Sequence, residues 1–304
     1  MRQDPIVTTT RPLLAVALLA LAACGGSDAD ATTPSTTTTA PAPATTDVPT
    51  PETTAAATST TAATTSTEPP SDPAGAFAPI GPGPYPVGVS TITVDDPDGE
   101  RPLTVDVWFP LAPDTATLPA QQYTLLPGTF YESSGAVAAE PTALATDGPF
   151  PLVVYSHGSG GLRYIHSAYT EALAGHGHLV VAPDHTGNTA IERITGADVD
   201  IASIAIDRPD DVRRLIDGFT DPGHPAAGPW ASGVDPERIA VTGHSFGGYT
   251  AVVTTTGVSN AGGDVVADDR VGAIIPIAPS TAEALIPDDD IDDVDVPMMI
   301  VSGT

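Results

Sequence analysis

The spacing of apolar residues changes along the chain and predicts the order of its secondary structure. Apolar and polar residues alternate in Val89–Val94 and in Leu103–Pro110, with the turn sequence DPDG at 96–99 between them. Alternation with a period of two is typical of strands with one wet face, so these segments predict an antiparallel hairpin. Five later runs are continuously apolar, as in strands that are covered on both faces: Pro151–Ser156, His178–Ala182, Arg238–Thr242, Val271–Ile277 and Val296–Ser302.

Helical patterns separate these runs and predict helices at Tyr164–Gly175, Asp207–Phe219 and Phe246–Gly257. In the second helix the pattern puts two groups on opposite faces: apolar Val212, Leu215, Ile216 and Phe219, and charged Asp210, Asp211, Arg213 and Arg214. Strand–helix–strand order implies right-handed crossovers. We therefore expect the α/β class, with a mostly parallel central sheet, helices on both faces and an antiparallel amino-terminal hairpin.

The amino-terminal residues read as an export signal. Arg2 and Arg11 precede an apolar run, Leu13–Ala23, that is too short to cross a bilayer as a helix. The sequence LAAC at 21–24, followed by Gly-Gly-Ser, resembles a bacterial lipobox, in which the cysteine is lipidated. We expect residues 1–24 to be a lipoprotein signal peptide with Cys24 as the lipidation site. The alternative is an ordinary secretory signal with a chance cysteine.

Residues 25–75 consist almost entirely of Thr, Ala, Pro and Ser. Such a segment cannot bury enough apolar surface to offset the loss of conformational entropy, so it predicts a disordered tether. Residues 76–304 are then the folded domain. Cys24 is the chain's only cysteine, which excludes an intramolecular disulfide.

Charge narrows the possible partners. The chain has 38 acidic and 10 basic residues, a net charge of −28, which argues against a nucleic-acid partner because phosphate backbones bind basic surfaces. The acidic run Asp288–Asp295 lacks the glycine-containing pattern of a calcium loop, and we interpret it as a solvated loop. His166, His176 and His178 lack the spacing of a zinc site. No metal or cofactor is expected.

The strongest chemical signal is Gly243-His244-Ser245-Phe246-Gly247, which matches Gly-x-Ser-x-Gly between a predicted buried strand and a predicted helix. A serine on such a sharp turn has strained backbone angles and needs small neighbours. The helix amino terminus supplies positive potential where an oxyanion would form. The motif predicts Ser245 as a nucleophile; the alternative is a structural glycine turn.

The second signal is the glycine-rich loop at 157–161 (HGSGG), which directly follows another predicted strand. Serine hydrolases with this motif need a second backbone donor from such a loop. We predict the amides of Ser159 and Phe246 as the oxyanion hole, with Gly160, Tyr164 and His244 contacting substrate. A phosphate-binding loop is excluded because no Lys-Ser/Thr follows.

Together these residues resemble the α/β-hydrolase superfamily, and the similarity extends from about residue 84 to 304. It is closest to the dienelactone-hydrolase-like and platelet-activating-factor-acetylhydrolase-like branch, near cutinase-type polyester hydrolases. The segments that carry it are FPLVVYSHG at 150–158, APDH at 182–185, RPDD at 208–211 and GHSFGG at 243–248. One departure is that dienelactone hydrolases use a cysteine nucleophile, whereas this chain has a serine.

The resemblance implies a triad in the chain order Ser, Asp or Glu, His. All seven histidines precede Ser245: His157, His166, His176, His178, His185, His224 and His244. Glu283 is the one carboxylate in the loop after Val271–Ile277, and we interpret it as a surface residue. We expect the acid and the base to lie beyond Thr304, in a hydrolase truncated at its carboxy terminus with the last strand or strands missing. The truncated chain would then be nearly inactive.

The sequence thus predicts a serine carboxylic-ester hydrolase, a lipase or esterase that acts on a lipid-like or polymeric ester. We expect it to be a monomer anchored through Cys24 outside the cytoplasm, in a bacterial cell envelope. One rival is a non-catalytic lipoprotein with a hydrolase-derived fold. Another is a serine peptidase of the same fold, although the short connecting segments leave little room for the propeller or cap domain that such peptidases usually carry.

Overall fold

The computed structural model describes residues 82–303, apart from 97–98, 100, 114–116, 127, 261–262 and 281–293. The expected signal peptide (1–24), tether (25–75), Glu283 and the acidic run as far as residue 293 lie outside the described residues. The expectations for these segments stay predictions. Among the described helices, none is long and apolar enough to span a bilayer.

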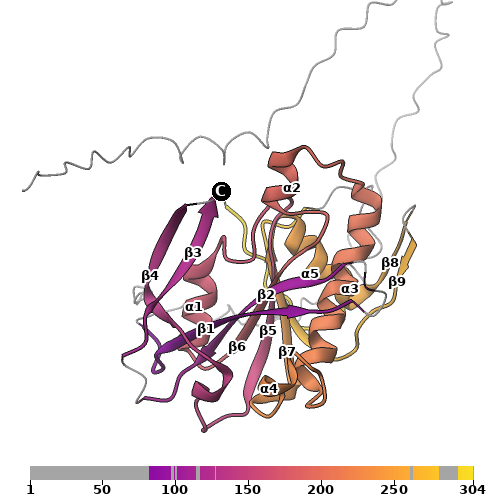
Figure 1. Cartoon of the computed structure of the whole chain (residues 1–304). Coiled ribbons are helices and arrows are strands. Elements are labelled where there is room, and N and C mark those ends of the chain that lie inside the picture. The colour runs from indigo at the N-terminus through magenta and orange to yellow at the C-terminus, as the bar shows by residue number, and fades with distance from the viewer. Residues whose placement is uncertain are drawn as a thin grey trace, which may run out of the picture. The chain divides into compact units, whose positions relative to one another are not determined.

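The described residues form an eight-stranded mixed sheet with the strand order β10-β7-β5-β6-β2-β1-β4-β3 (Figure 1). Two short strands, β8 and β9, pair separately as an antiparallel hairpin. The strands are β1 (Val87–Val94), β2 (Leu103–Pro110), β3 (Ala120–Leu126), β4 (Thr129–Ala138), β5 (Phe150–Ser156), β6 (Leu179–Asp184), β7 (Val234–His244), β8 (Val258–Asn260), β9 (Gly263–Val265) and β10 (Val271–Ile277).

The centre of the sheet is parallel, as predicted. β5 pairs in parallel with β6 and β7, and β7 pairs in parallel with β10. These are the first four of the continuously apolar runs. The segment predicted as a fifth strand, Val296–Ser302, runs parallel to β10 but does not form a continuous strand. It makes two isolated parallel bridges, Met298 with Ile274 and Val301 with Ile277, and four backbone hydrogen bonds to residues 274–278.

The antiparallel pairing of β1 with β2 is also confirmed, with Val87 opposite Pro110. The expectation of one wet face is wrong for β2, in which only Thr104 is exposed. The reason is the position of the strand. β2 lies inside the sheet between β1 and β6, and its alternate side chains enter two different apolar cores.

Helices cover both faces of the sheet. α1 packs on β1, β2 and β6, whereas α3 and α5 pack on β5 and β7 on the other side (Figure 1). The sheet therefore separates two cores, a larger one under α3 and α5 and a smaller one under α1. The helices are η1 (Pro141–Ala143, 3-10), α1 (Ser167–Gly175), α2 (Ala190–Thr195), α3 (Ile201–Thr220), α4 (Gly228–Ala231) and α5 (Phe246–Thr256).

Helix α3 begins at Ile201, six residues before the predicted start at Asp207. Asp200 caps it, because its carboxylate accepts from the Ala202 amide at 3.1 Å. Pro209 lies inside the helix and has no N–H for the carbonyl of Ala205, four residues earlier. The hydroxyl of Tyr249 on α5 donates to that carbonyl instead, at 3.2 Å, and this hydrogen bond links the two helices.

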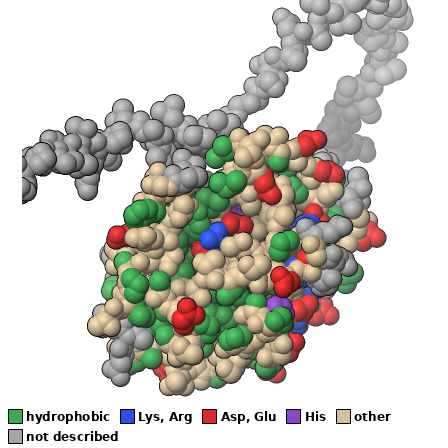
Figure 2. Space-filling view, in the orientation of Figure 1, with side chains coloured by type: hydrophobic (Ala, Val, Ile, Leu, Met, Phe, Trp, Pro, Cys, Tyr) green, Lys and Arg blue, Asp and Glu red, His purple; other side chains and the backbone are tan. Residues whose placement is uncertain are grey.

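Acidic side chains on the face in Figure 2 are spread among apolar and uncharged ones rather than gathered in one patch. Negative charge that is spread in this way is typical of a solvated surface.

Candidate active site

Ser245 occupies the turn between the end of β7 and the start of α5. Its backbone angles are φ 55° and ψ −115°, a conformation that residues with a side chain rarely adopt. Two backbone contacts hold it there. The Ser245 amide donates to the carbonyl of Ile277 on β10 at 2.9 Å, and the Ser245 carbonyl accepts from the Gly248 amide at 2.9 Å. The residue as a whole is partly exposed.

The glycines of the motif are required by close backbone approach. A Cβ atom on Gly247 would lie 1.9 Å from the carbonyl oxygen of Ser156, and one on Gly243 would lie 2.5 Å from the carbonyl oxygen of Gly247. No side chain fits at either position. The local sequence thus permits the strained turn that the pattern predicted.

The glycine-rich loop lies directly against this turn. A Cβ atom on Gly158 would lie 3.5 Å from the Cβ of Ser245 and 3.3 Å from Nδ1 of His244. Two segments separated by more than eighty residues thus meet at the carboxyl ends of β5 and β7. The structure brings together the two features that the sequence singled out.

His157 sets the orientation of this loop. The His185 amide must donate to Nε2 of His157, at 3.2 Å, so the ring proton lies on Nδ1 and is donated to the Gly158 carbonyl at 2.7 Å. Burial, and then the nearby charge of Arg208, lower the pKa of His157 far below its usual value, which keeps the ring neutral.

The Gly158 carbonyl also accepts from the Gly161 amide, at 2.9 Å. Both donors pull the oxygen of the Gly158–Ser159 peptide to one side. In a planar trans peptide the N–H points the opposite way from the carbonyl, so the Ser159 amide points away from these donors. This orientation suits the predicted role of Ser159, which stays a prediction.

Phe246 is the first residue of α5, where an amide has no acceptor within the helix. Its buried ring stacks on Tyr249, with centroids 5.0 Å apart and an interplanar angle of 5°. The ring therefore fixes the start of the helix immediately after Ser245. The predicted oxyanion role of the Phe246 amide is not tested by these contacts.

The residues predicted to contact substrate have different surroundings. His244 is half-buried, with its ring centroid 5.2 Å from that of His166. Gly160 has φ 65° and lies under the side chain of Arg193 on α2. Tyr164 is buried in an aromatic cluster, and its hydroxyl donates to the carbonyl of Thr124 on β3. The three roles stay predictions, although the bond to β3 occupies the polar end of Tyr164.

The sequence interpretation missed a serine–histidine–aspartate arrangement that does not include Ser245. Ser156 Oγ lies 2.9 Å from Nε2 of His185, and Nδ1 of His185 lies 2.9 Å from Oδ2 of Asp211. All three side chains are fully buried, so an ester cannot reach Ser156 in this conformation. The three side chains have the hydrogen-bonding geometry of a catalytic triad, but substrate cannot reach them, so we interpret them as a structural network.

The prediction of Asp211 on the polar face of α3 is therefore wrong. Its carboxylate accepts from Arg101, Arg214 and His185, and these partners make its burial possible. Burial raises the pKa of Asp211 to about 7, against the lowering effect of the arginines. The sequence pointed to Asp211 only as part of the segment RPDD at 208–211, which is one of the segments that carry the family resemblance.

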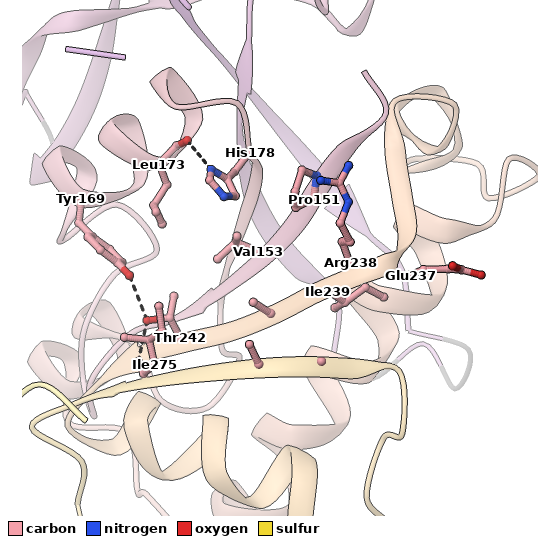
Figure 3. Close-up of a pocket in the computed structure, with 13 residues that line it drawn as sticks. Pro151, Val153, Tyr169, Leu173, His178, Glu237, Arg238, Ile239, Thr242 and Ile275 are labelled. Carbon is pink, nitrogen blue, oxygen red and sulfur yellow. Dashed lines mark hydrogen bonds between the residues drawn. The ribbon is translucent and has the colours of Figure 1, made fainter. Parts of the chain in front are cut away.

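A shallow groove of about 350 Å³ lies on the sheet beside α1 (Figure 3). Its walls include Val153, Tyr169, Leu173 and Ile275, and Ser245 is not among its lining residues. Tyr169 and Thr242 contact each other across one end, with their oxygens 3.4 Å apart. Among the described residues, no group of three or more acidic, histidine or cysteine side chains is arranged to hold a metal ion.

Comparisons with known proteins give relatives for this arrangement. Residues 75–200 match the family model described as platelet-activating factor acetylhydrolase, isoform II. The chain is 26% identical to the platelet-activating factor acetylhydrolase of Bos taurus, over 42% of this chain and 36% of that protein. It is 25% identical to that of Cavia porcellus, over 36% and 33%. The chain thus spans about a third of the length of these relatives.

Among solved structures, a ferulic acid esterase from Streptomyces cinnamoneus is similar, with a TM-score of 0.53 and 27% identity. The match covers 74% of this chain and 66% of the esterase chain. The family-model match includes the loop at 157–161 and ends before Ser245.

Proposed function

We propose that the full-length protein, which has the α/β-hydrolase fold, is an esterase that hydrolyses carboxylic esters through an acyl-enzyme on Ser245. The observation that carries the proposal is the strained Ser245 turn with Gly158 packed against it. It supports the proposal because a partly exposed serine at the start of a helix, with a glycine-rich loop against it, is the arrangement that stabilisation of an oxyanion by backbone amides requires.

The reaction follows from these groups. Ser245 Oγ attacks the ester carbonyl carbon and gives its proton to a histidine base, while the carbonyl oxygen becomes an oxyanion that accepts from the Ser159 and Phe246 amides. The intermediate collapses, and the alcohol leaves with the proton. Water then attacks the acyl-enzyme and releases the carboxylic acid. Among the described residues Ser245 Oγ has no hydrogen-bonded histidine, so this proposal takes the base and its acidic partner from elsewhere in the protein.

The proposed substrate is an ester with a lipid-like or polymeric portion. The relatives are named for different acyl groups, acetyl in the acetylhydrolase and ferulic acid in the esterase, so they support an ester substrate rather than one particular acyl group. We propose that the substrate contacts Gly160, Tyr164 and His244. The enzyme is proposed to work as a monomer and without a metal or cofactor.

The direct test is ester hydrolysis by the full-length protein and its Ser245→Ala variant. We expect wild type to cleave p-nitrophenyl acetate or butyrate, and the variant to lose at least about 10³-fold in kcat because the attacking oxygen is gone. The control is Ser259→Ala, which removes an exposed hydroxyl on β8 and should keep wild-type turnover. Unchanged turnover in Ser245→Ala would exclude the acyl-enzyme, and a folded wild type without turnover would favour the non-catalytic lipoprotein.

We also propose that the enzyme works outside the cytoplasm, anchored to a membrane through a lipid on Cys24. The support is the sequence LAAC at 21–24 and the following Thr- and Pro-rich residues 25–75. In a bacterial host, wild type should fractionate with membranes and Cys24→Ala should not. Membrane association that is the same in both proteins would contradict the anchor and leave the ester chemistry untouched.

A further inference from the structure

Arg208 is a fully buried cation whose bonding partners are uncharged. Its guanidinium donates to Asn188 Oδ1 at 3.1 Å, to Ser156 Oγ at 3.1 Å and to the backbone carbonyl of His157. None of the ion pairs among the described residues includes Arg208, and Asp211 acts on it only through its charge, which raises the pKa of the guanidinium. Burying a cation without a paired anion is costly, so the three hydrogen bonds are what makes this burial possible.

We infer that Arg208 is a positioning residue that holds both arms of the oxyanion hole in place, an inference that rests on the proposed function. The first arm is the loop at 157–161. Arg208 fixes the carbonyl of His157, and this peptide immediately precedes the Gly158–Ser159 peptide whose N–H is one proposed donor. The contact therefore controls where the Ser159 amide lies.

Asn188 adds a second route from Arg208 to the same loop. Its side-chain oxygen accepts from Arg208, which leaves the amide nitrogen to donate to Ser159 Oγ at 3.3 Å. Its backbone carbonyl accepts from the Gly160 amide at 3.2 Å. Asn188 is itself nearly fully buried, so these bonds are shielded from water.

The second arm is the start of α5. The guanidinium of Arg208 lies over the ring of Phe246, 5.0 Å from its centroid. Phe246 carries the other proposed donor and directly follows Ser245. One planar side chain thus contacts both arms, through hydrogen bonds at its edge and through its face.

Arg208 is also hydrogen-bonded to the buried Ser156–His185–Asp211 arrangement. Ser156 Oγ accepts from Arg208, and His185 and Asp211 continue the chain of hydrogen bonds to Arg101. Burial lowers the pKa of Arg208 to about 9, so the guanidinium is charged at neutral pH. A fixed positive charge beneath the loop also favours the negative charge of the transition state.

The test compares Arg208→Lys and Arg208→Met with Arg213→Met in the full-length protein. Lysine keeps the charge but loses the planar fork, methionine loses both, and Arg213 is a partly exposed arginine on the same helix. We expect both Arg208 variants to lose roughly 10- to 100-fold in kcat with KM within about two-fold, because misplaced donors weaken transition-state binding alone. Arg213→Met should match wild type. The affinity for a trifluoromethyl ketone, which forms a tetrahedral adduct, should fall by the same factor as kcat/KM.

Thermal unfolding shows whether each variant is folded. A folded Arg208→Met protein with wild-type kcat would overturn the inference. If that variant does not fold, Asn188→Ala decides, with a fall in kcat at constant KM expected and an unchanged kcat contradicting the inference. Turnover that persists in Ser245→Ala would overturn the proposed function itself, whereas loss there with fully active Arg208 variants would overturn only the role of Arg208.

Discussion

Ser245 keeps its strained backbone because the residues around it leave no room for relaxation. The strand before it and the helix after it are fixed by packing, and its amide and carbonyl are both hydrogen-bonded to backbone. Non-glycine residues at such angles cost roughly 1–3 kcal/mol each, which the surrounding fold must offset. In the proposed mechanism this strained turn presents the hydroxyl of Ser245 to the substrate.

Gly247 is the residue on which this turn depends most. In Gly247→Ala the new methyl carbon would start 1.9 Å from the Ser156 carbonyl oxygen, a backbone atom that cannot move away cheaply. We expect the free energy of unfolding, measured with urea, to fall by more than about 2 kcal/mol and esterase activity to fall with it.

Gly272 on β10 is the matched control. A methyl group there would meet its nearest neighbour, the carbonyl oxygen of Ile239, at an ordinary van der Waals distance of 3.7 Å. Gly272→Ala should leave stability unchanged or raise it slightly, because alanine restricts the unfolded chain. Equal stability of the Gly247 and Gly272 variants would show that the turn tolerates a side chain.

At the scale of elements, the sequence predicts what is apolar and periodic. β5, β6, β7 and β10 are continuous apolar runs, and α1, α3 and α5 follow them at helical spacing, so all were predictable. The sequence interpretation missed β3 and β4, which are polar strands at the sheet edge. Their pairing depends on tertiary position, and their residues carry little apolar periodicity.

Element ends were less predictable because local caps decide them. α3 extends back to Ile201 through the Asp200 cap. α2 was missed although it carries a capping box, in which Thr189 accepts from the Glu192 amide and Glu192 accepts from the Thr189 amide. This short helix lies beside the 157–161 loop, since Ala190 donates to the Gly161 carbonyl. A search for Thr-x-x-Glu would have found it.

Parts of the candidate site that depend on local sequence were predictable, whereas parts that depend on long-range packing were not. The turn at Ser245 and the glycine-rich loop at 157–161 each consist of a short sequence motif, so both could be predicted from the sequence. The burial of Asp211 and the contacts of Arg208 depend on which strands adjoin which helix. A helical pattern alone puts Asp211 among charged neighbours on a polar face, and only the packed α3 shows that it faces His185.

At the scale of the molecule, the sheet has one function above all, which is to bring the ends of β5, β6 and β7 together. His157, His185 and Ser245 follow these three strands, so one edge of the sheet carries the glycine-rich loop, its hydrogen-bonded neighbours and the proposed nucleophile. Parallel pairing aligns the carboxyl ends of the strands, and the helices on both faces of the sheet shield the strands from solvent. Acidic side chains are spread over the face of the molecule that Figure 2 shows.

The central claim is that Ser245, and not the buried Ser156, is the nucleophile. The most direct measurement is to treat the full-length protein with a fluorophosphonate and to identify the modified residue by peptide mass spectrometry. We predict a single phosphonylated serine, Ser245, because this residue is partly exposed while Ser156 has no exposed surface. Modification of Ser156, or none of Ser245 in a protein that hydrolyses esters, would contradict this account.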